Sequence, residues 1–173
     1  MRILHMIPDI GISNGVMSVI LNYFRAMPAD IVFDVVYFAE KEQTRQAEIE
    51  ALGGRVFKIN PPSPKTMLKR EMHAFFDVHK QEWEALHIHA PHFAVFIAPE
   101  AKRAGIQKIC THCHTTQFSL TPENERRNHI LSGLGQAYVK QRFACSSAAG
   151  AVWYRQKDFS VLPNAVDCHS FQY

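Results

Sequence analysis

Short apolar runs alternate with longer segments of helical period along the whole chain. The run at 2–7 (RILHMI) is followed by a loop containing glycines and then by 16–27, where apolar residues recur every three or four positions. The pattern predicts strands at 2–7, 33–39, 55–59, 85–90, 107–114, 141–146 and 160–163. This alternation predicts an α/β fold with a doubly wound, Rossmann-like parallel sheet that helices cover on both faces.

The segments between these strands read as helices. We expect helices at 16–27, 40–52 and 65–83, a helix at 93–105 interrupted or bent near Pro99, one near Arg126 and one through Trp153. In such sheets ligands bind outside the carboxyl ends of the strands. The rule selects the loops at 8–15, 90–93, 112–117, 146–147 and 163–167.

Composition limits the classes of protein that fit. The chain has 173 residues, 47% of them hydrophobic, which suits one domain with a full core. Lys and Arg exceed Asp and Glu by only 19 to 16 and form no basic block, which argues against nucleic-acid binding. The N-terminal pattern does not predict a signal peptide, and no apolar run reaches roughly 18 residues. We expect a cytoplasmic protein whose cysteines, Cys110, Cys113, Cys145 and Cys168, are reduced.

The loop PDIGISNGV places glycines between a strand and the start of a helix. Bare backbone N–H groups and the helix dipole favour an anion such as a diphosphate there. The loop matches neither the Walker motif nor GxGxxG, so a tight turn is an equally simple interpretation.

Two histidine pairs follow neighbouring predicted strands. In HIHAPH, His87 and His89 share one face and His92 lies just beyond; THCHTT repeats the arrangement with His112 and His114. The two pairs could therefore meet across neighbouring strands. Metal binding is not expected, because Cys113 faces away from the histidines and the CxxC spacing has no second copy. A histidine that donates to a phosphate or a sugar hydroxyl is the sharper hypothesis, and His114 suits it best.

Several of these segments together resemble a known family. The segments GISNGVMSVILNYFRAM, HIHAPH, THCHTT, FACSSAAGAVWY and VLPNAVDCHSFQY follow the order and spacing of the N-terminal domain of glycosyltransferase family 4, enzymes of the GT-B fold. The resemblance covers nearly the whole chain and is greatest to bacterial capsular and exopolysaccharide glycosyltransferases. It implies the acceptor-side half of a cleft between two Rossmann-like domains.

The resemblance also implies roles for individual residues. Asn14 and Gly15 would approach the donor diphosphate, although Asn14 replaces the first of the family's two adjacent glycines. His114 would be the catalytic histidine beside the donor sugar. Other residues would lie near the acceptor or the donor sugar: His89, His92, His112, Thr115 and Ser146. Asn164 and Asp167 would belong to the interdomain hinge, where Ala165 replaces the usual glycine.

The expected activity is retaining transfer of a hexosyl group from a nucleotide sugar to a polysaccharide or lipid-linked acceptor, without a metal or other cofactor. Residues 1–167 would form the acceptor-side domain and 168–173 the start of a linker to an absent C-terminal domain. The chain alone would be inactive. A lipid-linked acceptor would allow peripheral contact with the inner membrane face, although no segment is a clear amphipathic anchor. Two alternatives stay open: a stand-alone sugar- or nucleotide-binding module, and half of a nucleotide-sugar epimerase, which would need carboxylates at the cleft.

Overall fold

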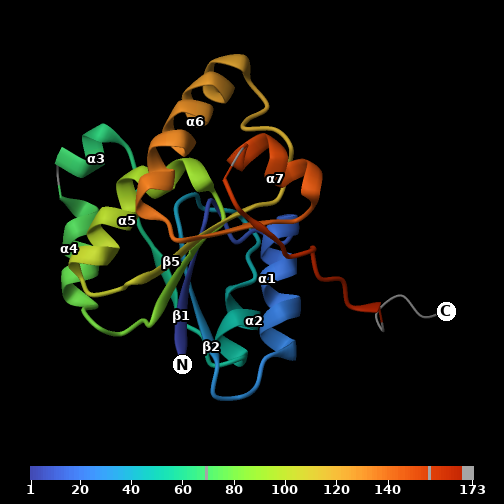
Figure 1. The fold of residues 1–173 in the computed structure, drawn as a ribbon. Helices are drawn as coiled ribbons and strands as arrows, with labels where there is room; N and C mark the ends of the chain where they lie inside the picture. The colour runs from blue at the N-terminus through green and yellow to red at the C-terminus, as the bar shows by residue number, and fades with distance from the viewer. Residues whose placement is uncertain (69, 156, 169–173) are drawn as a thin grey trace.

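A computed structural model describes residues 1–68, 70–155 and 157–168 (Figure 1). Its centre is one sheet of seven parallel strands in the order β3-β2-β1-β4-β5-β6-β7. The strands are β1 (Arg2–Ile7), β2 (Val32–Tyr37), β3 (Val56–Lys58), β4 (Ala85–Ile88), β5 (Lys108–Cys113), β6 (Gln141–Ala144) and β7 (Ser160–Val161). The predicted doubly wound α/β fold is confirmed. The strand order reverses between β1 and β4, so the loops after these strands diverge and leave a crevice.

Helices cover both faces of the sheet (Figure 1). They are α1 (Gly15–Ala26), α2 (Gln46–Ala51), α3 (Pro64–Leu68), α4 (Glu71–Val78), α5 (Ala94–Arg103), α6 (Pro122–Gly135) and α7 (Ser147–Tyr154), with 3-10 turns η1 (Pro91–Phe93) and η2 (Gln136–Tyr138). Helix α1 packs Met17 and Leu21 against Val35, whereas α4 and α5 pack Phe76 and Ile97 onto the other face. No helix within the described ranges is long and apolar enough to cross a membrane.

The helix predicted at 40–52 is wrong in its first half. Helix α2 begins only at Gln46, because the preceding residues pair with the loop after β1 instead. The Ile12 amide donates to the Gln43 carbonyl at 3.2 Å, and Gly11 forms an antiparallel bridge with Thr44. These contacts hold residues 43–44 against the glycine loop. Helical periodicity does not predict such a pairing between loops.

The prediction of one continuous helix at 65–83 is also wrong. The segment is divided into α3 and α4, and Arg70 between them has the left-handed conformation (φ 56°), which interrupts helical hydrogen bonding. Helix α4 ends at Val78, and Trp83 lies beyond it in the core. By contrast, α5 continues through Pro99 without interruption. Of the predicted linker at 168–173, residues 169–173 lie outside the described part of the chain.

Candidate functional site

A cavity of about 270 Å³ lies at the carboxyl edge of the sheet, among the loops after β1, β4 and β5. Five of the predicted site residues line it: Asn14, His89, His92, His114 and Thr115. Of the others, Gly15 adjoins the cavity through Asn14, whereas His112 and Ser146 are not among its lining residues. The topology therefore unites most of the predicted site, since parallel strands bring their following loops to one edge.

The glycine loop is organised by Asn14. Its Oδ1 atom accepts hydrogen bonds from the amides of Val16 (3.0 Å) and Met17 (3.2 Å), and its Nδ2 atom donates to the Asp9 carbonyl at 2.9 Å. Two N–H groups expected to be bare for an anion are therefore already bound, because asparagine is a strong N-cap. Within the described ranges no acceptor faces the Gly15 amide, and a Cβ atom placed on Gly15 would meet nothing within 4 Å.

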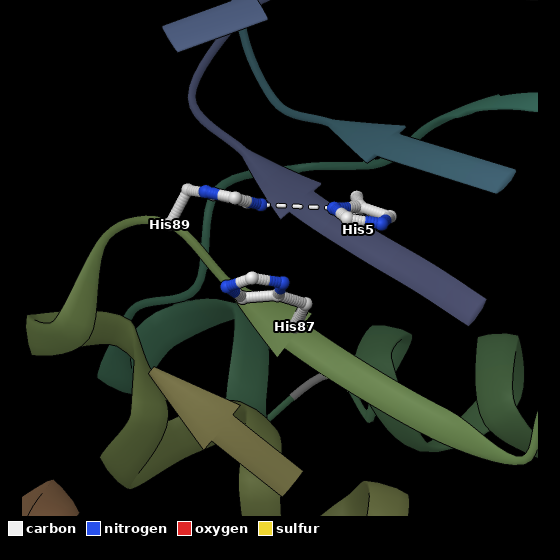
Figure 2. A group of neighbouring side chains, drawn as sticks. All are labelled: His5, His87 and His89. Atoms are coloured by element: carbon white, nitrogen blue, oxygen red, sulfur yellow. Dashed lines mark hydrogen bonds between the residues drawn. The ribbon is translucent and has the colours of Figure 1, made fainter. Parts of the chain in front are cut away.

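Five histidines gather on one face of the sheet, on β1, β4, β5 and the residues just after them: His5, His87, His89, His112 and His114. The two predicted pairs do meet, since the rings of His87 and His112 lie 5.4 Å apart and those of His89 and His114 5.1 Å apart. His5 was not predicted. It lies opposite His87 in the β1–β4 register, with its ring directed toward His89 (Figure 2).

Three hydrogen bonds connect part of this cluster into a chain. His5 Nδ1 lies 2.9 Å from His89 Nε2, and His89 Nδ1 lies 2.9 Å from His114 Nε2. His114 Nδ1 in turn lies 2.9 Å from Oδ1 of Asn164 in the predicted hinge. Both ring nitrogens of His114 are therefore engaged. A ligand that contacts either nitrogen must replace one of these partners.

His112 lies apart from this chain of bonds. Its Nε2 donates to the Leu162 carbonyl at 3.2 Å, and its ring faces a second cavity of about 280 Å³. That cavity lies between the sheet and α1 and is lined mainly by apolar side chains, including those of Tyr23 and Phe143. His112 thus lines the second cavity and not the cavity at the carboxyl edge, and its place near the donor or acceptor sugar stays a prediction.

The buried histidines resist protonation. Desolvation, with a smaller contribution from the neighbouring imidazoles, lowers the pKa of His5 to about 3 and that of His112 to about 2. Burial likewise holds the pKa of His87 and His89 well below the ordinary value. For His114, burial lowers the pKa while the bond to Asn164 opposes that shift. At neutral pH these side chains act as neutral donors and acceptors, not as cations.

His92 and Thr115 line the cavity, whereas Ser146 lies outside its lining at the start of α7. His92 lies in η1, and burial together with the charge of Arg127 lowers its pKa to about 4. Thr115 Oγ1 accepts from the Gln117 amide at 3.2 Å. Ser146 caps α7 by accepting from the Ala149 amide at 3.1 Å, so its observed contact is structural.

The predicted hinge residues lie on the segment after β7, residues 162–168, which we call the strap and which is hydrogen-bonded to α1. Tyr23 Oη donates to the Pro163 carbonyl at 2.7 Å and Asn22 Nδ2 donates to the Ala165 carbonyl at 2.9 Å. Asp167 lines a hollow beside the same helix. The hinge function of Asn164 and Asp167 stays a prediction.

Two histidine triads bring ring nitrogens within 4.8 Å of one another: His5, His87 and His89, and His89, His112 and His114. Two pairs of these nitrogens lie at hydrogen-bonding distance, 2.9 Å, and the rings of His87 and His89 are stacked with an interplanar angle of 24°. That no metal binds here stays a prediction. Burial raises the pKa of the Cys110 and Cys113 thiols to about 12, so both are protonated at neutral pH.

The fold is that of the N-terminal half of GT-B glycosyltransferases, and comparisons with known proteins support it. No family model matches the chain. The chain is 25% identical to "Putative glycosyltransferase EpsF" of Bacillus subtilis (strain 168) over 98% of its length and 46% of that protein. It resembles the structure of Anabaena Alr3699/HepE in complex with UDP, with a TM-score of 0.72, 16% identity, and coverage of 98% of this chain and 45% of that one. For the apo form of the lipopolysaccharide outer core galactosyltransferase WaaB the TM-score is 0.67, the identity 14% and the coverage 96% and 46%.

The predicted resemblance to glycosyltransferases of the GT-B fold is therefore confirmed, in sequence by one relative and in fold by the solved structures. The chain spans about half the length of the proteins that it matches.

Proposed function

We propose that this chain is the acceptor-side half of a retaining glycosyltransferase that moves a hexosyl group from a nucleotide sugar to a polysaccharide or lipid-linked acceptor. The observation that carries the proposal is the cavity at the carboxyl edge. It unites Asn14, His89, His92, His114 and Thr115 where the strand order reverses. Doubly wound sheets bind their ligands in that crevice.

The donor is proposed as a nucleoside-diphosphate sugar. HepE, whose fold this chain shares, has been crystallised in complex with UDP and with UDP-glucose. In the present chain the open face of Gly15 leaves room for a diphosphate to approach the start of α1. A phosphate oxygen there would meet the Gly15 amide and the positive end of the helix dipole.

His114 is proposed to donate a hydrogen bond from Nδ1 to an oxygen of the donor sugar or diphosphate. Burial keeps the imidazole neutral, so its contribution is a directed donor. Pre-aligned donors stabilise charge that develops on a leaving group. His89 would hold the ring in place through its 2.9 Å contact with His114 Nε2.

The proposed chemistry needs a cationic partner that these loops do not supply. Within the described residues, no lysine or arginine lines the edge cavity. A departing nucleoside diphosphate gains negative charge that such groups normally stabilise. We therefore propose that a second domain completes the site and that this chain alone transfers sugar negligibly. Asn164 and Asp167 would form the connection.

The epimerase alternative finds less support. Asp9 is the single carboxylate that lines the edge cavity in the described part of the chain, and its Oδ1 accepts the Gly11 amide at 2.9 Å. Proton abstraction from a sugar carbon needs a base that reaches the substrate. A stand-alone binding module would use the same cavity. It would differ from the transferase half in that this chain alone would bind its ligand tightly.

Two measurements test the proposal. Titration of the ¹⁵N-labelled chain with UDP-glucose, followed by NMR, should give weak binding with shifts at Asn14, Gly15 and His114 and no sugar transfer. Fusion of the chain to the C-terminal half of a GT-B transferase that uses the same donor should restore transfer. Tight binding by the chain alone would favour the binding module. Shifts confined to surfaces away from the edge cavity would contradict the proposed site.

A further inference from the structure

A single atom, Asn164 Oδ1, determines which ring nitrogens donate and which accept in the hydrogen bonds between these histidines. The carbonyl oxygen Oδ1 of Asn164 can only accept a hydrogen bond, so the Nδ1 atom of His114, 2.9 Å away, must carry the proton. A neutral imidazole has one N–H group. The Nε2 atom of His114 is therefore an acceptor.

The same reasoning passes along the chain of bonds. Because His114 Nε2 accepts, His89 must donate to it from Nδ1, and His89 Nε2 is then an acceptor too. His5 must consequently donate from its own Nδ1 across the 2.9 Å contact. The His5 Nε2 atom is left as a bare lone pair, buried and without a partner in the described part of the chain.

We propose that the amide oxygen of Asn164 is a positioning group: through this chain of hydrogen bonds it fixes three histidines as the tautomer with the proton on Nδ1. His114, His89 and His5 belong to β5, β4 and β1 or to the residues just after them. The proposal connects the strap after β7 to the centre of the sheet. Reversing the amide would reverse every bond in the chain.

Burial makes this order energetically meaningful. His5 is 4% exposed and His89 is 8% exposed, so water cannot readily replace a mismatched partner. A buried polar atom that loses its hydrogen bond destabilises the folded state, because water does not replace the lost partner. His5 and His89 therefore strongly prefer the tautomers that their neighbours require, whereas the bond between His114 and Asn164 lies at the exposed end of the series.

His112 provides an internal contrast. It belongs to the same cluster, but its Nε2 faces the Leu162 carbonyl at 3.2 Å and must carry the proton. Two residues of the strap thus select opposite tautomers in neighbouring rings, since Leu162 selects Nε2–H and Asn164 selects Nδ1–H.

The inference gives Asn164 a role in the proposed reaction, and that consequence rests on the proposed function. An oxygen of a bound nucleotide sugar that accepts from His114 Nδ1 would take the place of Asn164 Oδ1 and keep the same tautomer. The strap would then keep the proton of His114 on Nδ1 before the nucleotide sugar binds, so that this atom is ready to donate a hydrogen bond to it. The tautomer itself is a property of the unliganded chain, so it can be tested without transferase activity.

Long-range ¹H–¹⁵N correlation spectra of the chain, recorded above pH 7, distinguish the two neutral tautomers of each histidine. We expect Nδ1–H for His5, His89 and His114, and Nε2–H for His112. Nε2–H at His114 would overturn the proposal. Ring-nitrogen shifts typical of metal coordination that disappear with EDTA would also overturn it, because the rings would then be organised by an ion.

Variants of the strap isolate the amide oxygen. Asn164→Ala should abolish the Nδ1–H preference at His114 and shift the tautomers of His89 and His5, whereas Asn164→Asp should retain all three because a carboxylate also accepts. Asn22→Ala removes a strap contact without touching the histidines and should leave the tautomers unchanged. Unchanged tautomers in Asn164→Ala, or equal loss in Asn22→Ala, would contradict a specific role for the Asn164 amide. Backbone amide spectra would verify that each variant is folded.

Discussion

His5 Nδ1 lies 2.9 Å from His89 Nε2, so that β1 and the end of β4 are joined through imidazoles as well as through the backbone. Both rings are buried among further histidines that also resist protonation. The fold therefore keeps several bases neutral that an unfolded chain would protonate near pH 6.5.

This difference in protonation predicts that the free energy of unfolding decreases as the pH falls below about 6.5. Burial lowers the pKa of His5 to about 3, so between pH 6.5 and 3 the unfolded chain binds a proton that the folded chain excludes. The free energy of unfolding should accordingly be constant with respect to this group above pH 7. It should decrease by about 1.4 kcal/mol per pH unit and per such histidine below pH 6. Urea denaturation at a series of pH values measures the slope.

His87→Phe is the matching variant for this first prediction. His87 Nε2 is buried without a partner in the described residues, and its pKa is held well below the ordinary value. Phenylalanine should remove one excluded proton, so the acid slope should decrease by about 1.4 kcal/mol per pH unit. Stability at pH 8 should be equal to or greater than that of the parent chain. An unchanged slope would show that His87 is protonated in the folded state.

The sheet was predicted well because parallel strands that are buried on both faces appear in the sequence as continuous apolar runs. It predicted the meeting of His89 and His114 because alternation and strand adjacency suffice for that. His5 was missed because its role depends on β1 lying beside β4, which the local pattern of RILHMI does not contain. The Asn14 cap and the Gly11–Thr44 bridge were missed for a related reason, since hydrogen bonds between loops leave no periodic signal.

Gly15→Ala tests whether the open face at the start of α1 receives a ligand. A Cβ at Gly15 meets nothing within 4 Å, so the substitution should leave the fold intact. If a diphosphate approaches there, the methyl group should weaken UDP-glucose binding in the NMR titration. Gly133→Ala in α6 is the matched control, because its Cβ is equally unobstructed. It should raise stability by roughly 0.5–1 kcal/mol, as expected for Gly to Ala in a helix, without affecting binding. Equal binding by both variants would contradict the proposed position of the diphosphate.

Substitution of Asp34 tests a buried carboxylate in the otherwise apolar strand β2. Its carboxylate is 0% exposed and accepts from Trp83 Nε1 at 2.7 Å and from Arg55 at 2.7 and 3.1 Å, with Arg2 as a further partner. Asp34→Ala should destabilise the chain by about 3–5 kcal/mol, because it leaves these donors unpaired in or near the core.

Glu48→Gln serves as the control for Asp34. Glu48 makes its ion pairs with Arg25 and Arg45 at the surface, where such pairs contribute about 0–1 kcal/mol. Urea midpoints of the two variants should therefore differ widely. Similar midpoints would mean that the buried carboxylate contributes no more than a surface one.

Tyr23→Phe tests how firmly the strap that carries Asn164 is held. The Tyr23 hydroxyl donates to the Pro163 carbonyl at 2.7 Å, and the neighbouring Leu162 amide donates to the Ala144 carbonyl at 2.9 Å. Loss of one hydrogen bond costs about 0.5–1.5 kcal/mol, so local opening of the strap should increase two- to ten-fold. Hydrogen exchange at the Leu162 amide measures that increase. Tyr138→Phe is the control, because Tyr138 lies away from the strap in η2, where its ring faces Lys102. Exchange at Leu162 that is equal in the two variants would show that the strap is held by its backbone contacts alone, and Tyr23 would then have no part in placing Asn164 against His114.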